Sequence, residues 1–251
     1  MGTVITVASG KGGTGKTSFC ANVAVALCAL GEKVLVIDAD AGLRSLDLVL
    51  GMTDSLLFSY ADVIAGTASL KEAAVKHSIV RNLRVLTAPQ NLPLQGMDPA
   101  AIAGLVQRAR AHFTFTLIDC SAGISPDILS FGAASDRAVI VSTPDATSLR
   151  SAQSMAQALA QAGQGSSKIA VNRVRRDLMD RGDSANIDRA MDSAGLGLLG
   201  VIPEDPDVIA CANHGRVLAM HSLGTAQQAY FNIARRLQGQ RVRLLSNVKG
   251  F

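Results

Sequence analysis

The stretch GKGGTGKT at residues 10–17 decides the fold of this 251-residue chain. It follows the apolar run TVITVAS at 3–9 and precedes a helical pattern at 16–30. A glycine-rich loop between a strand and a helix lets backbone N–H groups approach a phosphate at the helix N-terminus. The loop carries two lysines, Lys11 and Lys16, although one lysine suffices for this chemistry. The sequence therefore predicts a phosphate-binding loop with a second lysine that needs its own explanation.

Two nucleotide-binding templates fit this loop. Its glycines form the G-x-G-x-x-G of dinucleotide-binding folds, and residues 10–17 also form G-x-x-x-x-G-K-[ST]. Lys16 and Thr17 favour the second template, because an ammonium there neutralises terminal phosphates and a hydroxyl there ligates Mg²⁺. Neither an NAD-dependent reductase nor a glycine turn without a ligand needs these two residues. We therefore predict a nucleoside triphosphate, ATP or its product ADP, with Mg²⁺.

Carboxylates after two further apolar strands support the triphosphate interpretation. Asp119 ends the run FTLID, and Asp38 and Asp40 follow another strand in the sequence DAD. An acid at such a strand end orients magnesium through water, whereas a ribose-binding fold needs only one acid after the second strand. We expect Thr17, Asp38 and Asp119 to form the metal site.

The rest of the chain alternates short apolar runs with longer helical patterns. The strand candidates are TVITVAS, KVLVIDA, LRVLTAP, FTLIDC, RAVIVST, SKIAVNRV and LLGVI, and the helix candidates cover 16–30, 98–112, 125–134, 145–163, 183–194 and 222–238. Near-continuous Val/Ile/Leu strands separated by helices indicate an α/β fold, doubly wound, with a mostly parallel sheet and helices on both faces. No linker divides the pattern, so we expect one domain over 1–238 and a tail over 239–251.

Composition limits the partners and the compartment. Aromatic residues make up 4% of the chain and Trp is absent, which disfavours nucleic-acid recognition by base stacking. The cysteines show no C-x-x-C spacing, so we expect buried free thiols at Cys20, Cys28, Cys120 and Cys211. The sequence has neither a signal-peptide pattern nor an apolar run of about 20 residues. We therefore expect a cytoplasmic protein.

Lys11 makes the loop a deviant Walker A motif, KGGTGKT, and in this the chain resembles the MinD/ParA family of ATPases, which are P-loop NTPases of the SIMIBI type. Four further blocks resemble the family's first switch, its magnesium strand with the second switch, its base-recognition strand and its base-binding loop. They are DADAGLRSLDLVLG at 38–51, IDCSAGIS at 118–125, VNRVRRDLMDRGD at 171–183 and LLGVIPEDPDVI at 198–209. The resemblance runs from residue 3 to about residue 238.

The resemblance implies a role for the second lysine. Lys11 is expected to reach the phosphates of a nucleotide held by a second copy of the chain, as an arginine finger does. The alternative is a solvated lysine beside a glycine turn. The catalytic residues are then Lys11, Lys16 and Asp40, of which Asp40 orients the attacking water.

Nucleotide-binding residues follow from the same blocks. The phosphate loop contributes Gly10, Lys11, Gly12, Gly13, Thr14, Gly15, Lys16, Thr17 and Ser18. An amide offers both a donor and an acceptor, so Asn172 can pair with the adenine edge, and we expect Arg173 to stack on the base. Pro203, Glu204 and Asp205 are expected to close over it.

The C-terminal end is basic. No Asp or Glu follows Asp207, whereas these Lys and Arg residues do: Arg216, Arg235, Arg236, Arg241, Arg243 and Lys249. On a helix, basic residues of the tail would lie toward one side. Four apolar side chains would share the other side: Leu244, Leu245, Val248 and Phe251. This pattern predicts an amphipathic helix on an anionic membrane surface. The alternative is that these side chains dock on the domain itself or fray.

The resemblance implies a MinD-like ATPase that forms a homodimer with ATP, associates peripherally with the inner face of the cell membrane and positions the division site. A MinC-like inhibitor and a MinE-like or other activator would be its partners. The segment AGISPDILSF favours an FlhG-like regulator of flagellar number or placement, and a ParA-like partition ATPase that binds nonspecific DNA is a further alternative. Ser121 stands where the family usually has proline, which bears on the mobility of the second switch. Ser151 stands where MinD-like proteins commonly have an aspartate near the partner-binding face, which leaves the partner open.

Overall fold

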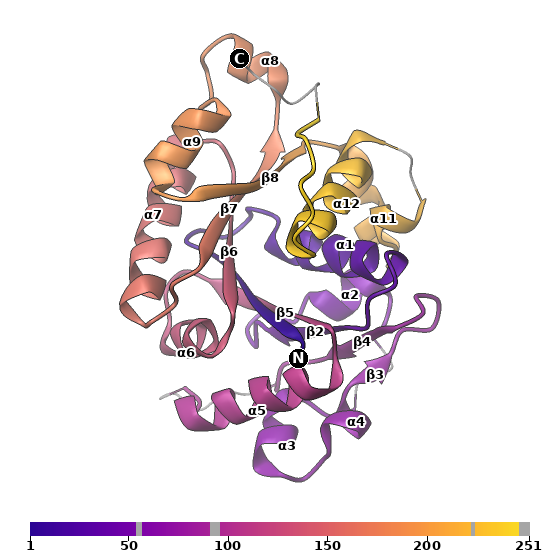
Figure 1. The fold of residues 1–251 in the computed structure, drawn as a ribbon. Coiled ribbons are helices and arrows are strands. Elements are labelled where there is room, and N and C mark those ends of the chain that lie inside the picture. The colour runs from indigo at the N-terminus through magenta and orange to yellow at the C-terminus, as the bar shows by residue number, and fades with distance from the viewer. Residues whose placement is uncertain (54–56, 91–95, 222–223, 246–251) are drawn as a thin grey trace.

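The phosphate loop leaves the end of a strand in the middle of an eight-stranded sheet (Figure 1). The computed structural model describes residues 1–53, 57–90, 96–221 and 224–245. The strands are β1 (Thr3–Ser9), β2 (Val34–Ala39), β3 (Val75–Lys76), β4 (Leu83–Leu86), β5 (Phe115–Ala122), β6 (Arg137–Ser142), β7 (Ser167–Val174) and β8 (Gly197–Pro203). Their order is β3-β4-β2-β5-β1-β6-β7-β8, and every pair is parallel except β3–β4.

Helices cover both faces of this sheet, so the predicted doubly wound α/β architecture is confirmed (Figure 1). One face carries α1 (Lys16–Ala29), α2 (Leu46–Leu50), α11 (Leu218–His221) and α12 (Thr225–Leu237). The other carries α3 (Tyr60–Ala65), α4 (Leu70–Ala73), α5 (Pro99–His112), α6 (Pro126–Ala134), α7 (Ala146–Gln161) and α9 (Ile187–Ala194). The short helices α8 (Arg176–Asp180) and α10 (Pro206–Asn213) follow β7 and β8.

Helix α1 is enclosed on all sides. It packs on the sheet and is covered by α12, α2 and α11, so buried residues lie all around it. A helix that is apolar on every side belongs in a protein core or a membrane. Among the helices that the structure describes, none is long and apolar enough to span a bilayer.

Each of the strands expected from the sequence is present, and each of the six longer helices is present with shifted bounds. The helix expected over 183–194 begins at Ile187, and the one expected over 222–238 is described as Thr225–Leu237. The sequence missed β3, α2, α3, α4, α8, α10 and α11. All but α10 are too short to display a helical or strand period, and α10, which is as long as α9, has no fully buried residue to mark one.

The cysteines are free thiols, and three of them are buried as expected: Cys20, Cys28 and Cys120. The fourth prediction was wrong, because Cys211 is only partly covered on α10, a helix without fully buried residues. Within the described residues no cluster of His, Cys, Asp and Glu side chains could hold a metal ion on its own.

Two glycines bring α2 and α10 into backbone contact. Gly51 ends α2 with φ 65°, and Gly215 follows α10 with φ 62°. A Cβ on Gly51 would lie 2.6 Å from the carbonyl oxygen of Gly215. The segment after β2 and the segment after β8 therefore meet without a side chain between them.

Candidate nucleotide-binding site

The loop at residues 10–17 connects β1 to α1 and leaves the start of that helix without a side-chain cap. Gly13 and Gly15 adopt φ 79° and 86°, a left-handed backbone that glycine accommodates without strain. Gly15 is the N-cap of α1, and no side chain accepts a hydrogen bond from the first turn. Uncapped N–H groups and the positive end of the helix dipole attract an anion. The loop is therefore built to bind phosphate.

Lys16 and Asp119 lie together beneath this loop. The Lys16 Nζ and Asp119 Oδ1 atoms are 3.9 Å apart, and both side chains are buried. Within the described residues Asp119 Oδ1 has no hydrogen-bond partner, and neither does the buried Thr14 Oγ1. Buried polar atoms without partners are rare and call for a ligand that completes them.

Asp38 brings a second buried carboxylate to the same place. It lies opposite Asp119 in the register between β2 and β5. Burial raises the pKa of Asp38 to about 7, and burial raises that of Asp119 to about 6. Repulsion from Asp119 and Asp40 adds to the raised pKa of Asp38, and repulsion from Asp40 adds to that of Asp119, where Lys16 opposes the rise. A divalent cation with Thr17 nearby would remove the repulsion, so this donor set fits Mg²⁺.

The segment after β2 folds over Asp38. Both carboxylate oxygens of Asp38 accept backbone N–H groups, from Asp40 at 2.9 Å and from Leu46 at 3.3 Å. Asp40 is half-buried, and its Oδ1 accepts from Leu43 N at 3.3 Å. Asp38 therefore also shapes the loop that carries Asp40, which the sequence did not indicate.

A cavity of about 620 Å³ adjoins the phosphate loop. It brings together residues predicted to bind the nucleotide from three parts of the chain: Gly15, Ser18, Asn172, Arg173, Pro203, Glu204 and Asp205. Asn172 Nδ2 donates to the carbonyl oxygen of Thr14 at 2.8 Å, and a Cβ on Gly15 would lie 2.3 Å from that nitrogen. Asn172 thus ties β7 to the phosphate loop, in addition to the base contact predicted for it.

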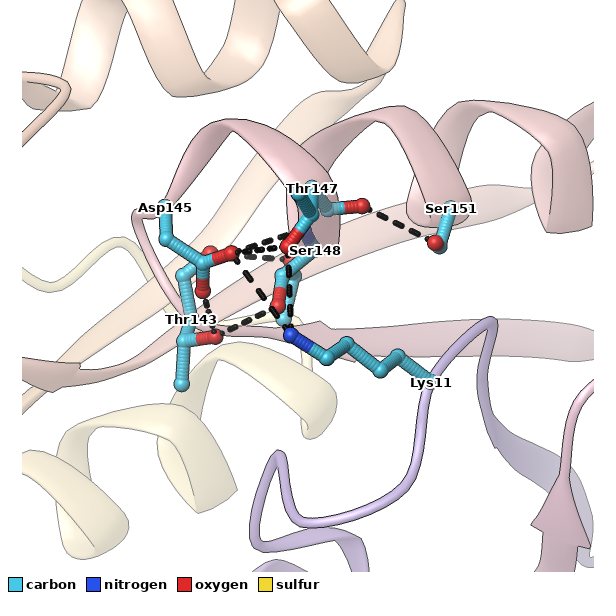
Figure 2. A network of polar contacts seen from close by, with 7 residues as sticks. Lys11, Thr143, Asp145, Thr147, Ser148 and Ser151 are labelled. Atoms are coloured by element: carbon cyan, nitrogen blue, oxygen red, sulfur yellow. Dashed lines mark hydrogen bonds and ion pairs between the residues drawn. The ribbon is translucent and has the colours of Figure 1, made fainter.

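Lys11 points away from this loop, toward the N-terminus of α7 (Figure 2). Its Nζ donates to Thr147 Oγ1 at 3.1 Å and lies 3.9 Å from Asp145 Oδ1. Burial alone would raise the pKa of Asp145, but hydrogen bonds from Thr143, Thr147 and Ser148 hold it well below its ordinary value. The Lys11 side chain remains half-exposed, and within the described residues its polar contacts are with Thr147 and Asp145.

Ser151 of α7 lies against Gly10, at the start of the loop. A Cβ on Gly10 would lie 2.1 Å from the carbonyl oxygen of Ser151, so only glycine lets β1 approach α7 here. The Ser151 hydroxyl donates to the carbonyl oxygen of Thr147 at 2.9 Å (Figure 2). Gly10 is therefore a packing residue.

The family described as CobQ/CobB/MinD/ParA nucleotide binding domain matches residues 5–218. The septum site-determining protein MinD of Bacillus subtilis (strain 168) is 36% identical over 246 residues, which are 97% of this chain and 92% of that protein. This chain belongs to the MinD/ParA family. MinD of Thermotoga maritima (strain ATCC 43589) is 35% identical and covers 97% of this chain and 91% of that protein.

Solved structures of MinD/ParA proteins have the same fold. The MinC:MinD complex of Aquifex aeolicus superposes with a TM-score of 0.90 at 31% identity, over 97% of this chain and 98% of that chain. MinD of Pyrococcus horikoshii complexed with Mg-ADP gives 0.82 at 30% identity, over 94% of this chain and 96% of that chain. The MinD/ParA fold thus extends over most of the length of this chain.

The tail differs from the predicted helix as far as it is described. Residues 240–245 are not helical, and Leu244 and Leu245 are half-buried against the apolar cores of the MinD/ParA domain. Arg236 holds this segment, because its Nη2 donates to the carbonyl oxygen of Val242 at 2.9 Å and its Nη1 to that of Leu199 at 3.2 Å. Val248 and Phe251 lie outside the described residues.

The sequence missed part of the cavity wall. Arg175, Arg176 and Asp177 line it beside the predicted Arg173, and Tyr230 of α12 lines it from the other side. The run RVRRD at 173–177 carried a signal for the first three, since its basic residues follow a strand at the nucleotide-binding edge. Nothing near Tyr230 in the sequence connects it to this edge.

Proposed function

We propose that the chain is a Mg²⁺-dependent ATPase of the MinD type. The observation that carries the proposal is the joint position of Lys16, Asp38 and Asp119 under an uncapped phosphate loop, beside a cavity of nucleotide size. Asp119 Oδ1 and Thr14 Oγ1, which lack hydrogen-bond partners in the part of the chain that the structure describes, support bound Mg²⁺ and phosphate. The Mg-ADP complex of the Pyrococcus horikoshii relative supports the same ligands.

Each residue near the phosphates has a distinct task in this proposal. Loop N–H groups and Lys16 hold the phosphates, while Thr17, Asp38 and Asp119 hold the metal. Mg²⁺, when bound, neutralises charge that develops on the phosphate oxygens. Asp40 positions the attacking water from the loop that Asp38 organises. Residues 172, 173 and 203–205 enclose the base.

We propose further that ATP joins two copies of the chain through this edge. Apolar side chains on the segments that follow β2, β5 and β8 are exposed, which favours a protein partner at the nucleotide edge: Leu43, Leu48, Ile124 and Ile209. Lys11 is retained by an exposed hydrogen bond of small net worth, so it can leave Thr147 and reach the second copy's nucleotide.

The relatives support division-site placement as the role of this cycle. The curated relatives reported above are septum site-determining proteins, which favours this role over the flagellar and partition alternatives. The Aquifex aeolicus complex supports a MinC-like inhibitor as a partner, and a MinE-like activator completes the proposal. The protein would work in the cytoplasm and on the inner face of the membrane, through its basic tail.

Sedimentation of an Asp40→Ala variant tests the ATPase dimer. We expect a dimer with Mg-ATP and a monomer with Mg-ADP, because the variant retains the triphosphate. Adding Lys11→Ala should abolish the dimer while Mg-ATP still binds. As a single substitution, without Asp40→Ala, Lys16→Ala should lower the rate of phosphate release from ATP at least about 100-fold. A monomer of Asp40→Ala under both nucleotides would contradict the proposed dimer.

A further inference from the structure

A second, larger cavity lies at the opposite edge of the sheet from the phosphate loop. Its volume is about 780 Å³, and it is bounded by the starts of β6 and β7, by the end of α12 and by the tail. The strands of this sheet are parallel, so their starts face away from the nucleotide-binding ends. Five basic side chains line the cavity: Arg137, Lys168, Arg236, Arg241 and Arg243.

No carboxylate balances these cations among the described residues that line the cavity. Asp136, next to Arg137 in the sequence, is engaged on the other side of the strand. Its Oδ1 accepts from Arg110 Nη2 at 2.9 Å, and its Oδ2 accepts from Val4 N at 2.8 Å. Glu32, near the end of α12, accepts from Gln238 at 2.7 Å. The cavity thus collects positive charge that is not neutralised.

Three of the cations are available to a ligand. Arg236 is committed to the carbonyl oxygens of Leu199 and Val242. Arg137 donates a hydrogen bond from Nη1 to the carbonyl oxygen of Leu237 at 3.0 Å, and its other N–H groups have no partner among the described residues. Within the described residues, Lys168, Arg241 and Arg243 are exposed and have neither a hydrogen-bond nor an ion-pair partner through their side chains. Like charges gathered in one hollow repel one another unless an anion joins them.

We propose that this cavity is a second anion site, which binds a phosphate-bearing ligand between the domain and its tail. Arginine and lysine together are the usual donors to phosphate, since the arginine fork binds two oxygens and the ammonium adds a point charge. The site is a hollow and not a flat basic stripe, which favours a compact ligand over a nucleic-acid duplex. The ligand would join Lys168 and Arg137 of the sheet to Arg241 and Arg243 of the tail. This inference goes beyond the proposed ATPase and does not depend on hydrolysis.

Calorimetric titration with inorganic tripolyphosphate tests the site on the full chain. Saturating Mg-ADP is present so that tripolyphosphate does not bind at the phosphate loop. If that loop does not bind nucleotide, the Lys16→Ala variant serves the same purpose by removing the loop's lysine. We expect one binding site whose affinity falls about tenfold or more in Lys168→Gln, the loss of one charge-assisted hydrogen bond. Arg150→Gln, which removes an exposed cation of α7, should change the affinity less than about twofold. Thermal melting verifies that both variants fold.

Vesicles identify the source of the phosphate. Retention on vesicles with phosphatidylglycerol, compared with phosphatidylcholine alone, should fall in Lys168→Gln if the ligand is a lipid headgroup. If Lys168→Gln keeps its retention on vesicles but binds tripolyphosphate more weakly, the ligand is a soluble phosphate compound. Lowered retention and this second outcome both support the site. Equal tripolyphosphate affinity in wild type and Lys168→Gln overturns it, and so does a loss confined to duplex DNA binding.

Proteolysis reads out the tail directly. Trypsin cleaves after Arg241 and Arg243, and a ligand held between these residues and Lys168 should slow that cleavage. We expect about fivefold slower cleavage with saturating tripolyphosphate in the wild type and no slowing in Lys168→Gln. Equal cleavage rates with and without tripolyphosphate in the wild type would overturn the proposed position of the ligand.

Discussion

Gly10 and Gly12 lie two residues apart in the phosphate loop and meet different surroundings. A Cβ on Gly10 would lie 2.1 Å from the carbonyl oxygen of Ser151, a backbone atom that cannot turn aside. A Cβ on Gly12 would find its nearest neighbour, the Cβ of Ala122, at 4.0 Å. Gly10 is therefore required by packing, whereas the Cβ position of Gly12 is open.

Gly10→Ala should destabilise the protein by about 2–3 kcal/mol, because the added methyl group pushes β1 away from α7. Gly12→Ala is the matched control and should change the unfolding free energy by less than about 0.5 kcal/mol. Urea denaturation of both variants without nucleotide measures the difference. Equal unfolding midpoints for the two variants would contradict the assignment of Gly10 to packing.

Lys11 is held in its present position by the Thr147 hydroxyl and by the Asp145 carboxylate of its own chain. Thr147→Val removes the hydrogen-bond acceptor and leaves only the 3.9 Å ion pair, so Lys11 should be held less tightly and the ATP-bound dimer should form more readily. We expect the dimer dissociation constant to fall about 2–5-fold, the worth of an exposed polar contact. Analytical ultracentrifugation with Mg-ATP in the Asp40→Ala background measures it, and Thr147→Ser, which keeps the hydroxyl, should leave it unchanged. A weaker dimer in Thr147→Val would contradict this reading of the contact.

At the scale of elements, His77 joins the turn after β3 to the end of α2. Its Nδ1 accepts backbone N–H groups from Ile79 and Val80, both at 3.0 Å, and its Nε2 lies 3.0 Å from the carbonyl oxygen of Leu50. An Nδ1 that accepts leaves the proton on Nε2, which then donates to Leu50. The neutral ring therefore fits this place and the charged ring does not, because a protonated Nδ1 cannot accept.

Burial lowers the pKa of His77 below its ordinary 6.5, although the bond to Leu50 opposes this. Below pH 6.5 His77 is protonated in the unfolded chain but stays neutral in the folded chain. The free energy of unfolding therefore falls as pH falls from 6.5 to the pKa of His77 in the folded protein. We expect a loss of at most about 1.4 kcal/mol per pH unit in that window. Thermal melting between pH 7.5 and 5.5 checks it, and His77→Gln should lack this component. An identical pH dependence in His77→Gln would contradict it.

The predictable elements are those whose environment is uniform along their length. Helix α1 and strands β1, β2 and β5 are buried on every side, so their apolar runs were sufficient to find them and the loops that follow. Short helices such as α8 and α10 have no buried face and therefore no period to read. The apolar spacing of the tail fits a membrane surface and the domain's own surface equally well, so the spacing alone does not separate an amphipathic helix from a docked segment.

The site followed the same division. The phosphate loop and the acids at strand ends were predictable because their chemistry is local in sequence. Contacts between distant segments were not, since nothing in the sequence pairs Asn172 with Thr14, Lys11 with Thr147 or Gly10 with Ser151. Each of these contacts ties the loop to β7 or α7, so the missing information concerned how the loop is held.

At the scale of the whole molecule, the tail is a separable attachment to an otherwise complete sheet. Removing residues 241–251 should lower the unfolding free energy by about 1–3 kcal/mol, because two half-buried leucines and the bonds from Arg236 to Val242 are lost. The truncated chain should keep Mg-dependent ATP hydrolysis and lose ATP-dependent retention on anionic vesicles. Vesicle sedimentation and phosphate release measure the two, and undiminished retention would contradict membrane attachment through the tail.

The glycine contact between α2 and α10 has a mechanical consequence. Gly51 and Gly215 meet backbone to backbone, so no flexible side chain can absorb a displacement of one against the other. The segment that folds over Asp38 and the segment that walls the cavity beside the phosphate loop should consequently move together. A bound triphosphate that moved the segment after β2 would also move α10 and so change its contacts with the adenine. Loss of the outermost phosphate would then change how the base is held at the other end of the nucleotide.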